Sequence, residues 1–326
     1  MTKLIKDDII LRLQKGGGIS FYWEEVYNGI CEDFDILTVN DPFWRRYNNV
    51  RYSSDSPHLF HSSYYRVSTN KLAINITTVH DFVYEYFARG LRKSLHAYQK
   101  RYALENSKGI ICISENTKKD LLKLYPQFAS REIVTIYNGF NTLDIEPKRV
   151  TGIFPGEEFY LFVGSRAHYK NFFYAANIAK LSKIRLVIVG GGALTNLELK
   201  ELTSNECSYY HLAWAEDCEL KWLYKNALAL LYPSQYEGFG MPPLEALYQG
   251  CFPFCLDTPS NQEIYGEYIP LCEVGNPSRA VDFIGTHLRK GAPVCRTALH
   301  KKFNWKKCSA ETAQFLKYQN SGGGFS

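Results

Sequence analysis

The sequence predicts an α/β protein built from two doubly wound, parallel-sheet domains. Short apolar runs alternate with helical patterns along the chain, which is typical of repeated strand–helix–strand units. The runs are apolar throughout rather than alternating, as strands are when helices cover both faces of their sheet. The chain has 326 residues, about twice the length of a usual domain, so two domains are expected.

The individual elements are predicted from where these patterns begin and end. Ser114, with Thr117 three positions on, predicts a capped helix directly after a strand, and Asp217 predicts a similar helix start. The expected helices cover 117–125, 172–181 and 219–226, and the expected strands cover 9–11, 34–39, 72–79, 109–113, 133–137, 159–163, 184–189 and 227–232.

Domain boundaries follow from a change in composition. Residues 141–158 are rich in Asp, Glu, Pro, Gly and Lys without periodicity, and they separate two strong strand patterns. We therefore expect a first domain over 1–145, a second over 146–305, a last helix over 306–320 that crosses back to the first domain, and a disordered tail over 321–326. The side chains of the last helical pattern expected to face inward are Trp305, Ala310, Ala313 and Leu316.

Composition and charge exclude two classes of protein. Apolar residues make up 45% of the chain and charged residues 22%, which excludes a disordered chain. The 38 basic and 33 acidic residues leave a net charge of +5, too little for a typical nucleic-acid binder. No nucleic-acid partner is therefore expected.

The cysteines and the apolar runs indicate the compartment. The nine cysteines include no Cys-x-x-Cys pair, so neither a zinc site nor a disulfide framework is predicted, and a reducing cytosol fits. Residues 1–14 lack the apolar core of a signal peptide, and no run reaches the ~18 apolar residues of a spanning helix. We expect a cytoplasmic protein, with any membrane contact peripheral at the inner face of the membrane.

The strongest local feature is the run 233–246, which follows a buried strand and opens a helix. Gly238 and Gly240 would let the backbone approach a ligand closely, and the two prolines that follow are typical of a helix start with free amide groups. Glu237 and Glu245 would then bind hydroxyl groups on either side. A surface turn with acidic residues at a helix start is the alternative, but the full run favours a ligand site.

Two further glycine-containing segments carry candidate phosphate contacts. Arg166 and Lys170 follow a buried strand through Gly164, and two cations four residues apart can neutralise a diphosphate without a metal. Solvated surface charge is the alternative for this pair. Gly17 and Gly18 suit close backbone approach to the same diphosphate, or they form a flexible turn.

His80 ends an apolar run, which places its imidazole at the carboxyl edge of a parallel sheet, where α/β folds bind ligands. A structural histidine is the alternative, and Asp81 beside it would orient the ring or contact an acceptor. The glycines of 186–192 do not complete a dinucleotide fingerprint, because Thr195 stands where the third glycine belongs. We expect an ordinary strand-to-helix turn there.

The segment 82–103 combines basic and aromatic residues. A helix of this kind can lie on an anionic membrane surface, so peripheral membrane contact is one interpretation. A solvated helix packed by its apolar side is the other, since Glu85 and Glu105 interrupt the basic charge. The sequence leaves both open.

Five motifs in a fixed order give the chain a family resemblance. Glu237 and Glu245 stand in Glu-Gly-Phe-Gly-x-Pro-x-x-Glu-Ala, and at this run the sequence resembles the retaining glycosyltransferases of family 4. Glu263 resembles a further family position. The resemblance implies the fold called GT-B, in which two Rossmann-like domains face a cleft. The other motifs that resemble the family are Gly16–Ser20, Thr78–Phe82, Ile113–Lys118 and Phe162–Arg166 with Lys170–Asn171.

The resemblance implies transfer of a sugar from a nucleoside diphosphate sugar to a hydroxyl of a glycan or lipid-linked glycan, with retention of anomeric configuration. It implies that Arg166 and Lys170 stabilise the leaving diphosphate, that Glu237 binds donor-sugar hydroxyls, and that His80 and Asp81 lie near the reacting carbon and the acceptor. Contacts to the substrate are expected from Gly17, Gly18, Gly164, Gly238, Phe239, Gly240, Met241, Glu245 and Glu263, with Glu245 on the ribose.

No cofactor and no metal ion is expected, because the nucleotide sugar is a substrate and no Asp-x-Asp site is evident. Similarity to bacterial surface-polysaccharide enzymes suggests GDP-mannose as the donor. Two other functions stay open at this point. One is an inactive GT-B protein that only binds a nucleotide sugar, and the other is a GT-B sugar-nucleotide epimerase, which would rearrange the sugar and release nucleotide without an acceptor.

Overall fold

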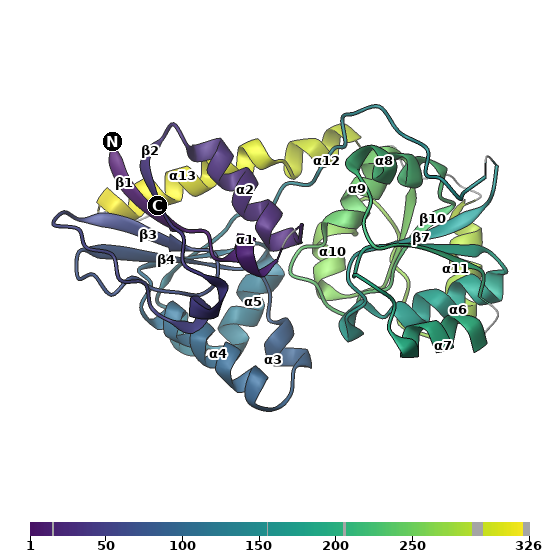
Figure 1. Cartoon of the computed structure of the whole chain (residues 1–326), viewed down its shortest axis with the longest axis horizontal. Helices are drawn as coiled ribbons and strands as arrows, with labels where there is room; N and C mark the ends of the chain where they lie inside the picture. Colours follow the sequence, from purple (N-terminus) through teal and green to yellow (C-terminus); the bar gives the residue numbers. More distant parts are fainter. Residues whose placement is uncertain (15, 155, 205–206, 289–295, 322–326) are drawn as a thin grey trace. The chain divides into compact units, whose positions relative to one another are not determined.

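A computed structural model describes residues 1–14, 16–154, 156–204, 207–288 and 296–321. The chain divides into two compact units, each built around its own sheet (Figure 1). One unit consists of Met1–Gly139 with Phe303–Ser326, and the other of Phe140–Lys302. The first unit thus ends a few residues before the predicted boundary at 145, and it takes up the chain again at Phe303.

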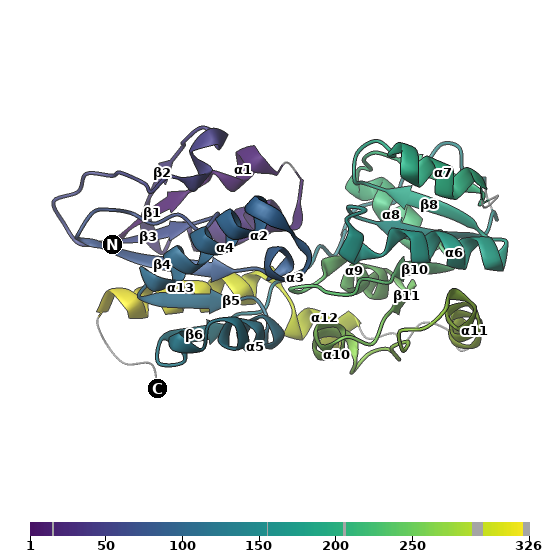
Figure 2. The same cartoon turned by 90° about the horizontal axis from the view of Figure 1, so that it is seen from below.

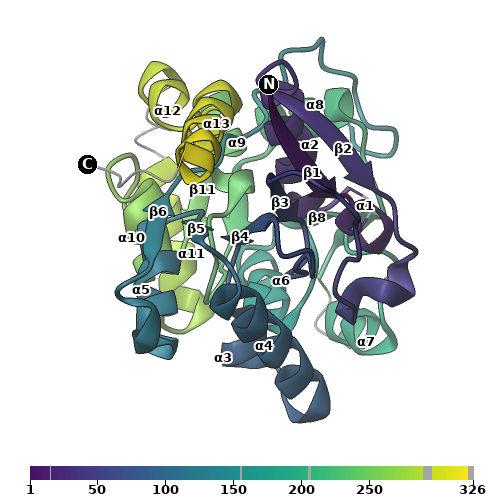
Figure 3. The same cartoon turned by 90° about the vertical axis from the view of Figure 1, so that its left-hand side faces the viewer.

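The first unit is a six-stranded parallel sheet with helices on both faces. Its strand order is β2-β1-β3-β4-β5-β6, and Figure 3 shows the strands in this order across the sheet. The helices α2 (Gly18–Ile30) and α13 (Trp305–Ser321) lie on one face, and α4 (Gly90–Glu105) and α5 (Glu115–Leu124) lie on the other (Figure 1). The strands are β1 (Thr2–Asp7), β2 (Phe34–Val39), β3 (His58–Ser62), β4 (Ala73–Val79), β5 (Gly109–Cys112) and β6 (Glu132–Thr135).

The second unit repeats this architecture with five parallel strands in the order β11-β10-β7-β8-β9. One face carries α8 (Asp217–Asn226) and α9 (Met241–Gln249), and the other carries α6 (Phe172–Ser182), α7 (Asn196–Ser204) and α11 (Pro277–Leu288) (Figure 1). The strands are β7 (Phe159–Val163), β8 (Arg185–Val189), β9 (Tyr209–Leu212), β10 (Ala229–Tyr232) and β11 (Phe252–Cys255). The predicted fold class, two doubly wound parallel sheets, is therefore confirmed.

Four strands differ from the sequence-based prediction. The expected strand at 9–11 is wrong, because the chain begins helix α1 (Ile10–Leu13) there, and the first strand is β1. Two lysines interrupt the apolar pattern of β1, so no continuous run marks it. The strands β3, β9 and β11 were not predicted. Two buried histidines interrupt the apolar pattern of β3. The strands β9 and β11 lie at the edges of their sheet, and an edge strand such as β11 can contain a proline.

Two expectations about helices also change. The Ser114 cap is confirmed, because its side chain accepts a hydrogen bond from the Thr117 amide at 3.0 Å. Asp217 is not the capping residue. Glu216 is the capping residue of α8, and its backbone amide donates to the Glu219 carboxylate at 3.1 Å in a capping box. The segment 82–103 forms two helices rather than one, α3 (Val83–Phe87) and α4, separated by a turn at Gly90, whose φ is +67°.

The last helix, α13, packs beside α2 and runs along β4 and β5 (Figure 2). Its contact with α2 is close because Gly29 has no side chain, and a Cβ there would lie 2.4 Å from the Ser309 hydroxyl oxygen. Of the side chains expected to face inward, Ala313 and Leu316 are buried, whereas Ala310 is exposed. The predicted tail 321–326 lies outside the described residues except for Ser321, which ends the helix. No described helix is long and apolar enough to cross a bilayer.

Candidate functional site

The core of the candidate site in the second unit is an ion pair between Lys170 and Glu237. Lys170 ends a short 3-10 turn, η3 (His168–Lys170), that follows β7, and Glu237 lies in the loop after β10. Their charged atoms, Nζ and Oε1, are 2.6 Å apart, and both side chains are largely buried. The ammonium also donates to the Tyr232 hydroxyl at 3.2 Å. The sequence-predicted cation and carboxylate are thus brought together at the carboxyl edge of one sheet.

The glycine loop after Glu237 is held by Tyr265. Its hydroxyl donates to the carbonyl oxygens of Phe239 and Gly240. Gly240 has a φ of +82°, and a Cβ there would meet the Tyr265 hydroxyl, so this position needs glycine for two reasons. Gly240 caps α9, which begins at Met241 and has proline in its first turn. Pro242 and Pro243 have no N–H group, so the amides at this helix start that have no partner within the helix are those of Gly240 and Met241. These two amides suit a phosphate or a hydroxyl group.

Glu245 lies further along α9 and belongs to a separate contact. Its carboxylate accepts a hydrogen bond from the buried Tyr224 hydroxyl at 2.8 Å. Burial raises the pKa of Glu245 from 4.5 to about 7, partly offset by the bond from Tyr224. The two glutamates of the motif therefore have different environments: Glu237 faces a cation, and Glu245 faces a phenol. Of the other predicted contacts, Gly238 and Phe239 are buried and Glu263 is half-buried on α10 (Pro259–Tyr265).

Arg166 does not have the free guanidinium that the sequence predicted. Its Nε donates to the Glu198 carboxylate at 2.9 Å, and its two terminal nitrogens donate to the carbonyls of residues 190–193 at 2.6–3.2 Å. The side chain is only 3% exposed. Arg166 therefore holds the turn between β8 and α7, and this turn is the ordinary strand-to-helix connection predicted for 186–192. Gly164, which follows β7 with a φ of +122°, contributes to the same turn.

Glu198 shows why the turn after β8 needs a cation. It completes a capping box at the start of α7, in which its carboxylate accepts from the Thr195 amide at 2.7 Å and the Thr195 hydroxyl accepts from the Glu198 amide. Arg166 supplies the counter-charge for this buried carboxylate. The sequence signal was present, since Thr195 and Glu198 have the spacing of a capping box, and Thr195 replaces the third glycine of a dinucleotide fingerprint.

In the first unit, the loop after β1 leads into α2. Gly17 is the residue before the helix, and its amide donates to the Ser20 hydroxyl at 3.0 Å, while that hydroxyl donates back to the Gly17 carbonyl at 2.8 Å. Gly18 is the first residue of α2 and is exposed. A Cβ at Gly17 would meet the end of the Gln14 side chain, which is exposed and can move away, so packing alone does not require glycine there.

His80 follows β4 at the same edge of the first sheet. Its imidazole is buried and packs edge-to-face against the Tyr22 ring, with 4.8 Å between centroids. Burial, together with the charge of Lys100, lowers the pKa of His80 from 6.5 to about 3, so the ring is neutral near pH 7. A neutral imidazole can accept or donate a hydrogen bond but cannot supply a positive charge.

Asp81 does not orient the His80 ring. Its carboxylate accepts from the Val83 amide at 3.0 Å and so begins helix α3, while its carbonyl accepts from Lys100 Nζ at 2.7 Å. Lys100 is fully buried and pairs with Glu85 at 2.9 Å. The basic segment 82–103 was expected either to face a membrane or to be solvated, and Lys100 of this segment does neither, because it is buried and bonds Asp81 and Glu85.

The described residues contain no cluster of three or more His, Cys, Asp or Glu side chains placed to hold a metal ion. Among the site residues above, Lys170 combines partial exposure with a place at the sheet edge.

Comparisons with known proteins identify the family. Residues 31–143 match the family model described as Glycosyltransferase Family 4, and residues 145–291 match the model described as Glycosyl transferases group 1. The chain belongs to the family 4 glycosyltransferases. The boundary between the two matched regions of this family 4 chain lies close to the change of unit at Gly139.

Relatives of this family 4 chain include two O-antigen enzymes. The O-antigen chain mannosyltransferase RfbU of Salmonella typhimurium is 29% identical over 201 residues, which cover 57% of this chain and 53% of that protein. The O-antigen chain mannosyltransferase B of Escherichia coli is 26% identical over 282 residues, covering 76% of this chain and 71% of that protein. The chain thus spans about half the length of the first and 71% of the second.

Solved structures share the fold. A sucrose-phosphate synthase from Thermosynechococcus elongatus superimposes with a TM-score of 0.73 at 15% identity, covering 99% of this chain and 100% of that one. Anabaena Alr3699/HepE, solved in complex with UDP and glucose, has a TM-score of 0.69 at 14% identity, covering 97% and 100%. At these identities the likeness shows the fold alone.

Proposed function

We propose that this protein transfers a sugar from a nucleoside diphosphate sugar to a hydroxyl of a glycan or lipid-linked glycan, with retention of anomeric configuration, in the synthesis of a surface polysaccharide. The observation that carries the proposal is the Lys170–Glu237 pair beside the start of α9. A cation, a carboxylate and the amides of Gly240 and Met241 at one sheet edge match the three parts of a nucleotide sugar that need recognition, which are the phosphate charge, the sugar hydroxyls and the leaving oxygen.

The proposed roles follow from the partners of each group. Lys170 and the amides at the start of α9 stabilise the negative charge that develops on the leaving diphosphate, without a metal ion. Glu237 accepts hydrogen bonds from hydroxyls of the donor sugar once Lys170 turns to the phosphate. Arg166 acts through the turn at 190–193 that it holds, rather than by touching the phosphate. The neutral His80 ring of the first unit contacts a hydroxyl of the donor sugar.

GDP-mannose is the proposed donor, because both O-antigen relatives are named as mannosyltransferases. Glu245 is proposed to bind the ribose, with Tyr224 fixing its carboxylate. A thermal-shift series with GDP, UDP, dTDP and ADP tests the base, since a nucleotide that binds only the folded chain raises its melting temperature. Stabilisation by another nucleotide and not by GDP would contradict the donor assignment.

The test of the activity is transfer from the matching donor followed by NMR of the anomeric centre. We expect wild-type protein to release nucleoside diphosphate and to form a product with the donor's own anomeric configuration. Lys170→Ala should abolish release, whereas Lys200→Ala, an exposed lysine on α7, should not. Inverted product, or equal nucleotide release by the two variants, would overturn the proposal.

Peripheral membrane contact is a separate proposal for the first unit, with a different residue set from the one predicted. Lys100 is buried, but Leu91 is 90% exposed and Trp44 is 67% exposed, with Phe43 beside Trp44. Arg45 lies next to these rings and is exposed. Such a mixture suits the surface of an anionic bilayer.

Vesicle flotation tests the membrane proposal. Protein should float with vesicles that contain phosphatidylglycerol but not with pure phosphatidylcholine. Trp44→Ser should reduce the floated fraction, while Trp214→Ser, an equally exposed tryptophan of the second unit, should not. Equal flotation of both variants would place the contact elsewhere.

A further inference from the structure

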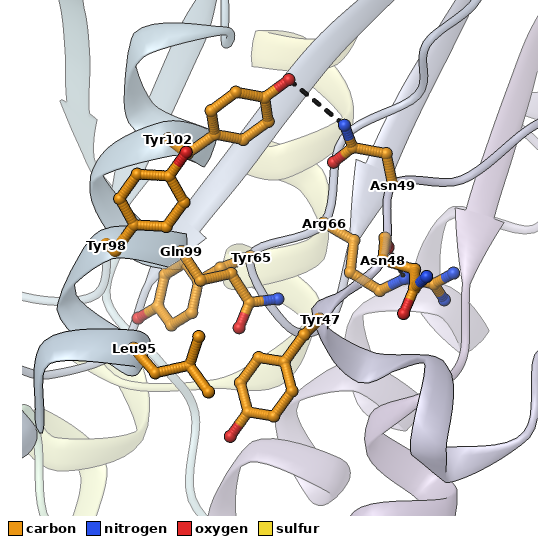
Figure 4. A pocket seen from close by; sticks show the side chains of 9 residues that line it. All are labelled: Tyr47, Asn48, Asn49, Tyr65, Arg66, Leu95, Tyr98, Gln99 and Tyr102. Atoms are coloured by element: carbon orange, nitrogen blue, oxygen red, sulfur yellow. Dashed lines mark hydrogen bonds between the residues drawn. The ribbon is translucent and has the colours of Figure 1, made fainter. Parts of the chain in front are cut away.

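The first unit contains a cavity that the proposed donor site does not use. Its volume is about 300 Å³, at the lower end of the range for small-molecule sites. Figure 4 shows side chains of α4 along one side, Tyr47 and Asn49 along the other, and Tyr65 and Gln99 between them. The lining residues that do not belong to α4 come from the segments after β2 and β3, at the same sheet edge as His80.

Tyrosine rings form much of the wall. Tyr98 and Tyr102 of α4 lie nearly parallel, with 22° between ring planes, and the Tyr102 hydroxyl accepts from the Asn49 side chain at 3.2 Å. Tyr98 is 58% exposed and Tyr47 is 37% exposed, and the Arg46 guanidinium lies 4.9 Å from the centre of the Tyr47 ring, so the larger open ring area is that of Tyr98. Flat aromatic faces edged by polar groups favour a ligand that is apolar on one side and polar around its rim.

Gln99 brings an unpaired acceptor into this cavity. Its side-chain nitrogen donates to the carbonyls of Arg46 and Tyr64, which fixes the orientation of the amide group. Its side-chain oxygen is buried and has no hydrogen-bond partner, and the residue is 7% exposed. A buried acceptor without a donor is unfavourable. The oxygen is covered in this structure, so a ligand hydroxyl in the cavity would gain this hydrogen bond only with a shift of the Gln99 side chain.

The charge of Arg66, the charged side chain among the described lining residues, is not free for an anionic ligand of the cavity. Arg66 lines it, but its guanidinium is paired with Asp7 at 2.9 Å and with Asp41 at 2.5 Å, and the third nitrogen donates to the Asn48 carbonyl at 2.8 Å. Two carboxylates against one guanidinium leave no positive charge for a phosphate. The amide groups of Asn49 and Gln99 would be costly to cover with a hydrocarbon chain.

Tyr65 connects the cavity with the His80–Asp81 segment. Burial raises the pKa of the Tyr65 hydroxyl well above 10, the Asp81 and Glu85 carboxylates add to this, and a hydrogen bond with the His80 backbone opposes it. Lys100 Nζ, which bonds the Asp81 carbonyl, lies 5.2 Å from the centre of the Tyr65 ring. Tyr65 also has a φ of +51°, a strained conformation for a bulky residue.

From these observations we infer that the cavity binds one neutral sugar unit of the acceptor glycan, stacked on Tyr98 and donating a hydroxyl proton to the Gln99 oxygen. The inference rests on the proposed function, because the acceptor is a glycan only if the protein is a glycosyltransferase of this substrate class. The cavity itself is defined without reference to the donor, so its binding can be measured without any nucleotide.

Saturation-transfer NMR on the full chain tests this inference. The probes are the methyl glycosides of mannose, glucose, galactose and N-acetylglucosamine, with inorganic phosphate as the anionic control. At least one glycoside should bind, phosphate should not compete with it, and Tyr98→Ala and Tyr47→Ala should each weaken it at least ~5-fold. The control, Tyr86→Ala, changes a similarly exposed tyrosine on α3 outside the cavity and should leave glycoside binding unchanged.

Several results would overturn the inference: no glycoside binding by the wild-type chain, equal binding by Tyr98→Ala, or displacement of the glycoside by phosphate. Displacement by phosphatidylglycerol vesicles would show that the face is a membrane contact instead. A parallel titration with GDP separates this inference from the proposed function. Glycoside binding that depends on Tyr98 in a chain that fails to bind any nucleoside diphosphate would support the sugar site and contradict the transferase.

Discussion

Glu245 should make the stability of this protein depend on pH. Its carboxyl group is buried, and burial raises its pKa from 4.5 in the unfolded chain to about 7 in the folded one. Between these values the folded chain keeps a proton that the unfolded chain releases, so the free energy of unfolding falls as the pH rises. At about 1.4 kcal/mol for each pKa unit, the stability lost across this window is roughly 3 kcal/mol.

The Glu245→Gln variant isolates this effect because it keeps an acceptor for the Tyr224 hydroxyl and removes the titration. Near pH 5 the variant and the wild-type chain should melt at similar temperatures. At pH 8 the variant should melt roughly 6–12 °C higher, given about 2–4 °C per kcal/mol for a unit of this size. Comparing both chains in each buffer cancels the pH dependence that other groups contribute to stability. One such group is Asp7, because burial raises its pKa to about 6. A difference in melting temperature that is the same at both pH values would refute the reasoning.

Other substitutions separate catalysis from folding. Lys170→Ala should lower the transfer rate at least ~100-fold in an assay at a temperature where the chain stays folded, and near-native turnover would contradict its role. Arg166→Ala should mainly lower the melting temperature, because buried Glu198 loses its partner at a cost of roughly 3–5 kcal/mol, and an unchanged melting curve would argue against that pairing. In calorimetric titrations, Glu237→Gln should weaken binding of the sugar nucleotide by roughly 1.5–3 kcal/mol and leave binding of the free nucleoside diphosphate unchanged. Equal losses for the two ligands would show that Glu237 does not contact the sugar. EDTA should leave turnover unchanged, whereas activity lost on chelation and restored by manganese would indicate a metal-dependent reaction.

The parts of the site that could be predicted from sequence are those where one residue type has one physical use. Gly240 needs a positive φ and has no room for a side chain, and the prolines after it mark a helix start. Such constraints are local, so they can be recognised within a run of a few residues. The same holds for Ser114, whose capping bond spans three positions.

The roles of charged side chains could not be predicted in the same way. Arg166 and Lys170 are four residues apart and follow the same strand, yet one is paired with Glu198 and the other with Glu237, far along the chain. Which carboxylate meets which cation depends on the order of strands in the sheet, and spacing does not contain that information. The burial of Lys100 could not be predicted either, since its partner Glu85 lies on the neighbouring helix α3 and their pairing depends on how α3 packs against α4.

Buried tyrosines are the functional residues that sequence reasoning missed, and they share a geometry. In the second unit, the hydroxyl of Tyr232 bonds Lys170, that of Tyr265 bonds the glycine loop at Gly240, and that of Tyr224 bonds Glu245. In an apolar run a tyrosine is counted with the core, but its hydroxyl needs a partner when buried, and the polar groups at the sheet edge supply one. Each of these rings therefore couples the packed core to one site group. Shortening any of them to phenylalanine would leave the core filled while freeing the site group to move, so ligand affinity should suffer more than stability.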